Sequence, residues 1–132
     1  MTHDAQADLH IHTHFSDSTS SPQEVLEQAD AQGISCISIT DHDTIDGIQP
    51  TVGLAKSFGI EIIPGIELSS EMNGKDIHVL GYCFDYKDQD FIEQVCFMQD
   101  SRIIRMKEMI EKLHAIGVDN ITFEEVSRLA QS

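Results

Sequence analysis

The chain has 132 residues, of which 40% are hydrophobic, and its 23 acidic and 8 basic residues give a formal net charge of −15. This length supports one domain at most, and no apolar run is long enough to span a membrane. So acidic a chain lacks the basic surface that binding to long duplex nucleic acid requires. The three cysteines are widely spaced and the N-terminus lacks a signal-peptide pattern, so we expect a cytoplasmic protein with reduced thiols.

The first informative segment is residues 8–12, where metal-competent and apolar side chains alternate. Asp8, His10 and His12 are spaced two residues apart. In an extended strand these three side chains project from one face, while the two apolar residues between them face the other way. A surface histidine cluster near a terminus would give a similar spacing, but the apolar alternation favours a half-buried strand that carries a metal site.

Helix and strand signals then alternate along the chain. Ser21 is a good helix N-cap, with proline at the first helical position and Glu24 as its capping-box partner, and Gly33 is a typical left-handed helix end. Pro50 is expected to interrupt the helical pattern of residues 44–58. We therefore expect, in order, a helix over 22–32, a strand over 34–40, an interrupted helix over 44–58, a strand over 60–63, an Asn73-Gly74 turn and a strand over 76–82.

A second polar cluster stands where the strand over 34–40 ends. Asp41, His42 and Asp43 follow this β-rich run directly. Ligands at strand ends are typical of α/β enzymes, because strand ends converge while the loops after them remain adaptable. An isolated Asp-His-Asp could equally be a helix cap with a solvated histidine, but two such clusters after two strands favour a shared site.

Beyond residue 84 the pattern becomes helical. Apolar residues recur at helical spacing as far as Leu113, and Arg102 interrupts the apolar stripe. Gly117 is expected to end this long helix, and Thr122 to begin a last short helix with a capping-box pattern. His114 lies near the end of the long helix, where a cation is favoured, and we interpret it as structural.

Four motifs in order along the chain resemble those of the PHP (polymerase and histidinol phosphatase) family of metal-dependent phosphoesterases. They are Asp8-Leu9-His10-Ile11-His12 followed by Ser16-Asp17, then Thr40-Asp41-His42-Asp43, Pro64-Gly65-Ile66-Glu67 and Asp76-Ile77-His78-Val79-Leu80-Gly81-Tyr82. Among the branches of the family, the chain looks most similar to the stand-alone nucleotide and oligonucleotide phosphoesterases.

The resemblance implies an α/β fold: the first half of a distorted PHP-type β/α barrel, with the start of a helical insertion at the C-terminal end. We expect residues 1–86 to form a partial PHP metal-dependent phosphoesterase domain and residues 87–132 to resemble the insertion. Similar proteins continue with strands and ligands that have no counterpart before Ser132. We therefore expect weak catalysis from this chain alone and self-association through open sheet edges. A truncated, non-catalytic metal-binding or partner-binding fragment remains the alternative.

The resemblance also implies the roles of the site residues. His10 and His12 would hold one ion, Asp17 and His42 a second, Glu67 would bridge ions, and His78 would reach a further one. The catalytic step is assigned to three of them, Asp17, His42 and Glu67. Three aspartates are expected to orient imidazoles through the nitrogen that is not on the metal; these are Asp8, Asp41 and Asp43.

Each assignment has a plainer alternative when the residue is considered alone. Glu67 could be an exposed strand carboxylate, His78 a core histidine and Asp17 a turn residue, so the joint match carries the prediction. Imidazole nitrogen and carboxylate oxygen without thiolate suit Mn²⁺, Zn²⁺ or Fe²⁺, and Mg²⁺ less well. We expect more than one divalent ion, with metal-bound hydroxide attacking the phosphate ester of a small phosphorylated substrate, a nucleotide or an oligonucleotide end.

Overall fold

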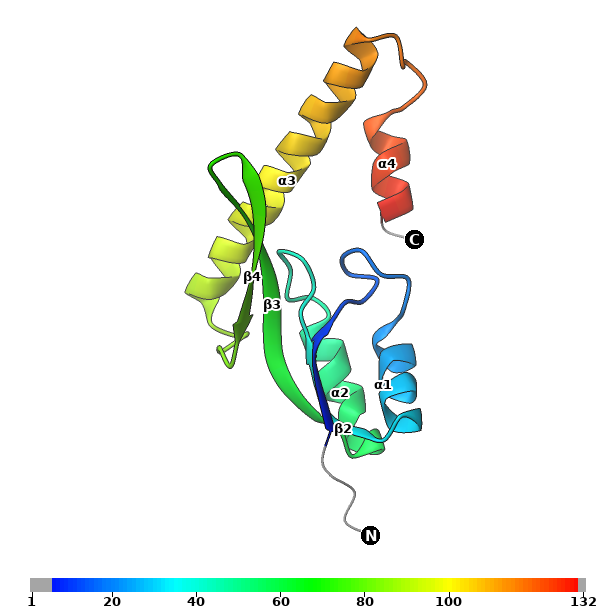
Figure 1. Ribbon diagram of the computed structural model, residues 1–132, viewed down its shortest axis with the longest axis vertical. Coiled ribbons are helices and arrows are strands. Elements are labelled where there is room, and N and C mark those ends of the chain that lie inside the picture. Colours follow the sequence, from blue (N-terminus) through cyan, green and yellow to red (C-terminus); the bar gives the residue numbers. More distant parts are fainter. Residues whose placement is uncertain (1–5, 131–132) are drawn as a thin grey trace.

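The computed structural model describes residues 6–130, and strands alternate with helices before the chain ends in two helices (Figure 1). Residues 1–5, at the start of the expected partial domain, and residues 131–132, at the end of the expected helical segment, lie outside the described part. The elements are β1 (Gln6–Ile11), α1 (Pro22–Ala31), β2 (Ile34–Ile39), α2 (Ile48–Phe58), β3 (Glu61–Met72), β4 (Lys75–Tyr82), α3 (Gln89–Ala115) and α4 (Phe123–Ala130).

The four strands form one sheet in the order β1-β2-β3-β4. β1, β2 and β3 are parallel, and β4 returns antiparallel to β3 as a hairpin. β3 is shared between two partners, because its first residues, 61–64, pair with β2 and its remainder, 65–72, pairs with β4. The Tyr82 hydroxyl of β4 donates to the Leu9 carbonyl of β1 at 2.7 Å. Since β1 and β4 are the two end strands, this contact shows that the sheet curls towards a barrel.

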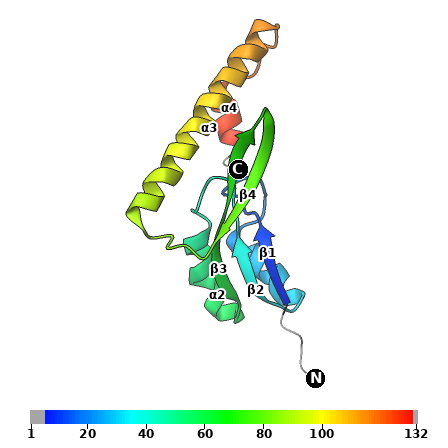
Figure 2. The same cartoon turned by 60° about the vertical axis from the view of Figure 1, so that its left-hand side comes forward.

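The hydrophobic core lies between the sheet and the two helices α1 and α2, which run beside each other along it (Figures 1 and 2). Leu26 of α1 is completely buried, and burial of a leucine side chain contributes about 1.5–3 kcal/mol. The apolar face of α1 therefore fixes the helix against the strands that carry the site. The buried cluster consists of Val25, Leu26, Ala29, Ile37, Ile39, Ala55 and Ile60.

The local signals at helix ends and turns are confirmed. Ser21 Oγ accepts a hydrogen bond from the backbone N–H of Glu24 at 3.3 Å, and Glu24 Oε2 accepts one from the backbone N–H of Ser21 at 2.7 Å. Gly33 follows α1 with φ of 73°. Asn73 and Gly74 both have positive φ, 54° and 75°, as the hairpin turn between β3 and β4 requires.

Two element predictions are wrong in their bounds. The helix expected over residues 44–58 is not interrupted: α2 begins at Ile48, so Pro50 lies in its first turn, where a backbone N–H has no helical partner to lose. The strand expected over 60–63 continues to Met72, because its second half gains β4 as a partner. Residues 44–47 consequently form a loop next to the end of β2.

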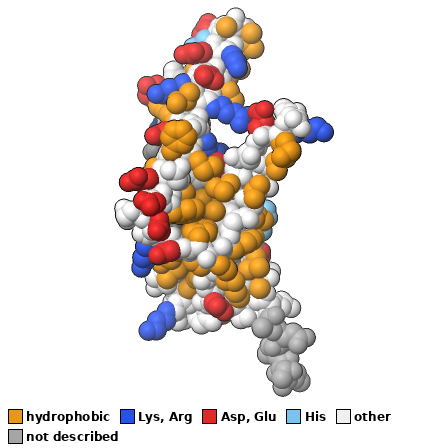
Figure 3. Space-filling view, turned by 90° about the vertical axis from the view of Figure 1, so that its left-hand side faces the viewer, with side chains coloured by type: hydrophobic (Ala, Val, Ile, Leu, Met, Phe, Trp, Pro, Cys, Tyr) orange, Lys and Arg blue, Asp and Glu red, His pale blue; other side chains and the backbone are white. Residues whose placement is uncertain are grey.

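α3 is a helix of 27 residues that extends well beyond the sheet, with α4 next to its distal end (Figures 1 and 2). The two helices are linked by His114 Nε2, which lies 2.7 Å from the Ile121 carbonyl, and by the Lys107 ammonium, 5.0 Å from the Phe123 ring centroid. Hydrophobic side chains gather on the side of the molecule that carries α3 and β4 (Figure 3). Within residues 6–130, no helix is both long and apolar enough to cross a membrane.

Candidate metal centre

Six potential metal ligands come together from the ends of β1 and β2, the loops after them, and the middle of the β3–β4 hairpin. The carboxyl ends of parallel strands meet at one edge of a sheet, and the β3–β4 hairpin adds a ligand from the antiparallel strand. The six are His10 on β1, His12 directly after it, Asp17 in the following loop, His42 after β2, Glu67 on β3 and His78 on β4. All six candidate ligands from the sequence are thus neighbours in the structure.

Glu67 is at the centre of this group, and only 5% of the residue is exposed. Its Oε2 lies 2.9 Å from His10 Nε2, 3.0 Å from His12 Nε2 and 3.7 Å from His42 Nε2. Its Oε1 lies 2.9 Å from His78 Nδ1. Both carboxylate oxygens therefore face imidazoles, and four histidines that lie on or shortly after three strands share one acidic residue.

Asp17 supplies a second carboxylate at the outer side of the group, where 61% of its side chain is exposed. Asp17 Oδ1 lies 3.1 Å from His12 Nδ1, and Oδ2 lies 3.5 Å from His42 Nε2. The two nitrogens of His12 thus face two different carboxylates. Three overlapping triads result, with ligand atoms in each within 4.8 Å of one another: His10–His12–Glu67, His12–Asp17–His42 and His42–Glu67–His78.

The imidazoles form a continuous row. Ring centroids are 5.1 Å apart for His10 and His12, 4.7 Å for His12 and His42, and 4.8 Å for His42 and His78. Burial lowers the pKa of His42, and although the charges of Glu67 and Asp17 act in the opposite direction, its pKa remains below the ordinary value. His42 is therefore neutral at pH 7, which is the form that binds a metal.

The pKa of Glu67 is also lower than usual. Burial alone would raise it, but the hydrogen bond with His10 and the charges of His42 and His10 outweigh burial. An ionised carboxylate surrounded by imidazoles is a donor set of nitrogen and oxygen that suits divalent first-row metals. The residues present therefore fit a divalent metal centre, and the three triads are overlapping alternatives in which Glu67 belongs to two.

Two of the three aspartates expected to orient imidazoles instead support the backbone near the ligands. Asp8 accepts a hydrogen bond from the backbone N–H of His10 at 3.2 Å. The buried Asp41 accepts from the backbone N–H and the hydroxyl of Thr13, both at 2.7 Å, and from the Ser16 hydroxyl at 2.6 Å. Among the hydrogen bonds of the described residues, neither carboxylate bonds an imidazole nitrogen, and the expected orienting roles of Asp8 and Asp41 remain predictions. No local pattern marks Thr13 as a partner.

Asp43 is the third such aspartate, and it too contacts no imidazole nitrogen among the hydrogen bonds of residues 6–130. Its carboxylate accepts from the backbone N–H of Ser69 and from Arg102 Nη1, both at 2.7 Å. Burial by itself raises the pKa of Asp43, but the bonds from Ser69 and Arg102 and the charge of Arg102 outweigh it and lower the pKa. Arg102 is the charged residue that interrupts the apolar stripe of α3. This interruption is the sequence signal that could have identified it as a residue near the site.

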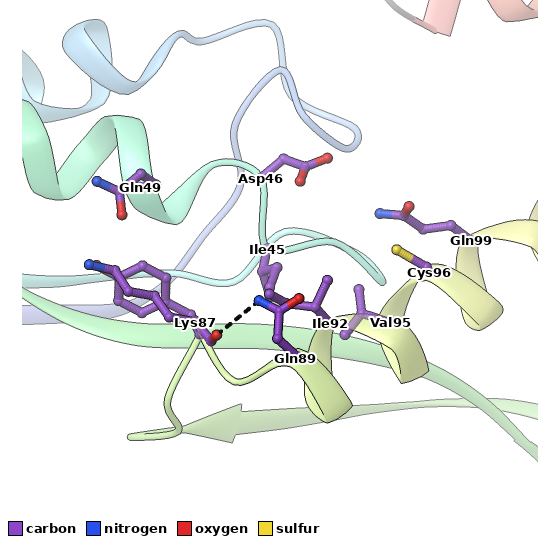
Figure 4. A pocket seen from close by; sticks show the side chains of 10 residues that line it. Ile45, Asp46, Gln49, Lys87, Gln89, Ile92, Val95, Cys96 and Gln99 are labelled. Carbon is purple, nitrogen blue, oxygen red and sulfur yellow. Dashed lines mark hydrogen bonds between the residues drawn. The ribbon is translucent and has the colours of Figure 1, made fainter.

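A separate cavity of about 340 Å³ lies between the loop after β2 and the first turns of α3 (Figure 4). Its apolar side chains include Ile45, Ile92 and Val95, and the amide of Gln89 donates to the Lys87 carbonyl at 3.4 Å at its edge. None of the six candidate metal ligands lines this cavity. The metal centre is therefore a group of converging side chains at the strand ends and is distinct from this cavity.

A curled α/β sheet with imidazoles and carboxylates at its strand ends defines the class of protein, a metal-binding α/β barrel-type fold. A family model described as the PHP domain matches residues 8–101, most of the chain. The chain belongs to the PHP family, as the sequence motifs predict. The match continues past residue 86 into α3, and the division of the chain at residues 86 and 87 remains a prediction.

Known relatives agree with this assignment. The chain is 37% identical over 116 residues to a 5'-3' exoribonuclease of Haemophilus influenzae, covering 86% of this chain and 41% of that protein. It is 28% identical over 114 residues to a 3',5'-nucleoside bisphosphate phosphatase of Chromobacterium violaceum, covering 86% of this chain and 40% of the relative. The chain thus spans about two fifths of the length of these curated relatives.

A solved structure supports the fold. A protein of Bifidobacterium adolescentis described as a metal-dependent phosphoesterase superposes with a TM-score of 0.81 at 30% identity, over 96% of this chain and 43% of that protein. The mixed α/β fold with a curled sheet therefore matches the first half of a PHP-type barrel, which confirms the expected fold class.

Proposed function

We propose that this protein is a metal-dependent phosphoesterase that hydrolyses phosphate esters of a small phosphorylated substrate, a nucleotide or the end of a short oligonucleotide. The observation that carries the proposal is the set of three overlapping triads in which Glu67, His12 and His42 are each shared. The names of the two relatives, an exoribonuclease and a nucleoside bisphosphate phosphatase, support the nucleotide class of substrate.

Mn²⁺, Zn²⁺ or Fe²⁺ is the expected occupant, and Mg²⁺ fits less well, because four of the six donors are imidazoles. Divalent ions bound there would lower the pKa of water to near neutrality and neutralise the charge that develops on the phosphoryl oxygens.

Three residues of the proposed centre have different expected roles. Glu67 stays ionised because of its lowered pKa, and it fixes the relative positions of the triads that share it. His42 stays neutral near pH 7 and belongs to two of the triads. Asp17 is the most exposed carboxylate of the group and is the ligand that faces the solvent from which a substrate arrives. Asp17, His42 and Glu67 are therefore the proposed catalytic residues.

The charge of the chain supports a small substrate. With 23 acidic and 8 basic residues, it offers few cations for the phosphates of a long duplex. A substrate with one or a few phosphates needs only the local positive charge of bound ions, which are often the largest charges in such a site. Tight binding to long double-stranded DNA would contradict this part of the proposal.

The test is hydrolysis of an aryl phosphate ester and of a nucleoside 3',5'-bisphosphate by the protein stripped of metal and then supplied with Mn²⁺. Turnover that depends on the metal is expected, and Glu67→Gln should abolish it. Glu71→Gln is the matched control, because Glu71 lies on the same strand, is exposed and belongs to none of the triads. Tight metal binding without turnover on either substrate would instead favour the non-catalytic metal-binding or partner-binding alternative.

Two further parts of the proposal concern the surroundings of the protein. The cysteines Cys36, Cys83 and Cys96 are free thiols, which supports a reducing, cytoplasmic compartment.

β1 and β4 are the end strands of the sheet, so within residues 6–130 each has one edge without a strand partner, and this supports self-association. Light scattering over a range of concentrations would show a rising mean mass if the edges pair.

A further inference from the structure

We propose that Arg102 of α3 is a positioning residue for the metal centre: by clamping Asp43, it holds the adjacent ligand His42 against Glu67. This inference rests on the proposed metal function. The proposal gives the long helix α3 a role in the metal centre, although α3 extends well beyond the sheet that carries the ligands (Figure 2).

The first step is the connection between Asp43 and β3. The backbone N–H of Asp43 donates to the Glu67 carbonyl at 2.9 Å, and the Asp43 carboxylate accepts from the backbone N–H of Ser69 at 2.7 Å. His42 itself forms a parallel bridge with Glu67, and the Glu67 N–H donates to the Asp41 carbonyl at 3.2 Å. The backbone on both sides of the His42 ligand is therefore bonded to the strand that carries the shared carboxylate.

The second step is the conformation of Asp43. Its φ of 51° lies in the left-handed region, which is uncommon for a residue other than glycine, although aspartate adopts it more readily than most. The local chain does not favour this conformation, so contacts with other segments must maintain it. The segment next to His42 therefore depends on the partners of the Asp43 side chain.

The third step is the charge of that side chain. The Asp43 side chain is only 2% exposed, and Arg102 Nη1 contacts it at 2.7 Å. The guanidinium also reaches Ser69 Oγ at 3.5 Å, so it lies over the point where Asp43 joins β3. A buried carboxylate that loses its cation is costly, and its simplest relief is to turn towards water. That movement would release Asp43 from Ser69 and displace His42 with it.

The arrangement of the triads makes the consequence selective. His42 belongs to two triads, whereas the triad of His10, His12 and Glu67 does not contain it. Loss of the Arg102–Asp43 ion pair should therefore weaken the binding of an ion that uses His42 as a ligand. Binding of an ion held by His10, His12 and Glu67 should be unchanged. Loss of a residue that orients a ligand typically lowers metal affinity about 10–100-fold.

The experiment is a titration of the metal-free full chain with Co²⁺, following both the affinity of each step and the visible spectrum, which reports coordination geometry. Arg102→Gln should weaken the His42-dependent steps about 10–100-fold, alter their spectra and leave one step unchanged. Arg102→Lys should restore most of the affinity because it returns the charge. Arg105→Gln is the matched control: Arg105 lies one turn further along the same helix, is exposed, and should leave every step unchanged.

A double substitution separates positioning from general stability. Asp43→Asn alone should weaken the same steps, and adding Arg102→Gln to it should change them little more, since both act on one contact. If Arg102→Gln does not fold, as judged by circular dichroism, the comparison of the double variant with the wild type decides: wild-type affinities would overturn the proposal.

Two other outcomes would overturn it. Unchanged affinities and spectra in a folded but less stable Arg102→Gln protein would show a structural role only, and equal weakening of every step would show general loosening. If the wild-type chain itself binds no Co²⁺, the proposed metal centre fails, which is a different result from a wild type that binds and an Arg102→Gln variant that binds equally well.

Discussion

Replacing Asp41 by alanine should destabilise the metal-free protein strongly, because one buried carboxylate holds the loop that carries two ligands. Asp41 is 1% exposed. It accepts hydrogen bonds from the Thr13 N–H and hydroxyl, both at 2.7 Å, and from the Ser16 hydroxyl at 2.6 Å. These donors lie between His12 and Asp17, so the same substitution should also disturb the triad that both ligands share.

The magnitude follows from the number and type of these bonds. A hydrogen bond to a charged group contributes about 1.5–3 kcal/mol, but bonds that share one acceptor are not additive and Ser16 can turn to water. We therefore expect Asp41→Ala to lower the free energy of unfolding by about 3–5 kcal/mol, a large part of the roughly 5–15 kcal/mol of a typical domain. Asp41→Asn keeps one carbonyl acceptor and should cost about 1–3 kcal/mol.

The assay is urea unfolding in the presence of a chelator, followed by circular dichroism and compared through midpoint and slope. Asp46→Ala is the control, because Asp46 is an exposed aspartate in the loop that follows, where substitution should change stability by less than about 0.5 kcal/mol. An Asp41→Ala protein within about 1 kcal/mol of the wild type would refute the view that this carboxylate holds the loop.

Three further predictions concern the shared ligand, the packing below the site and pH. Glu67→Gln should lower the metal stoichiometry in direct metal analysis while Glu71→Gln leaves it unchanged, and undiminished binding would disprove a bridging role. Gly65→Ala would place Cβ 2.8 Å from a buried threonine methyl and should cost about 1–3 kcal/mol in urea unfolding, whereas Gly53→Ala in open space should not destabilise. The pKa of His42 is lower in the fold than its ordinary 6.5, so the unfolded chain binds the proton more tightly and stability should fall as pH drops through 6.5. Urea unfolding of metal-free protein at about pH 7.5 and about pH 5.5 measures this, and His42→Gln should reduce the difference.

The sequence by itself determined the features that depend on residues close together along the chain. The capping box of Ser21 and Glu24, the helix end at Gly33 and the Asn73-Gly74 turn are formed as predicted. Such features are local because each uses contacts within a few residues, and the turn residues satisfy their own backbone requirements. The ordered motifs also identified the family and named the six candidate ligands, although the roles of those ligands remain proposals.

The sequence could not determine where one strand finds its second partner. β3 runs nine residues past the expected strand, to Met72, because β4 pairs with it from Gly65 to Met72. The helix α2 also differs from the expectation: it begins at Ile48, which places Pro50 in its first turn, where its missing N–H removes no helical hydrogen bond. The hydrophobic periodicity of one segment does not show which strand pairs with it or where its helix begins.

Only the tertiary structure decided which charged and polar groups meet at the site. Glu67 faces four imidazoles, and Asp41 binds Thr13, 28 residues before it. Asp43 binds Arg102, 59 residues after it. Local sequence cannot specify such pairs. Which donor contacts a given carboxylate depends on how the strand ends converge and on where a distant helix crosses them. The sequence supplied the ligands, and the curl of the sheet made one carboxylate common to them.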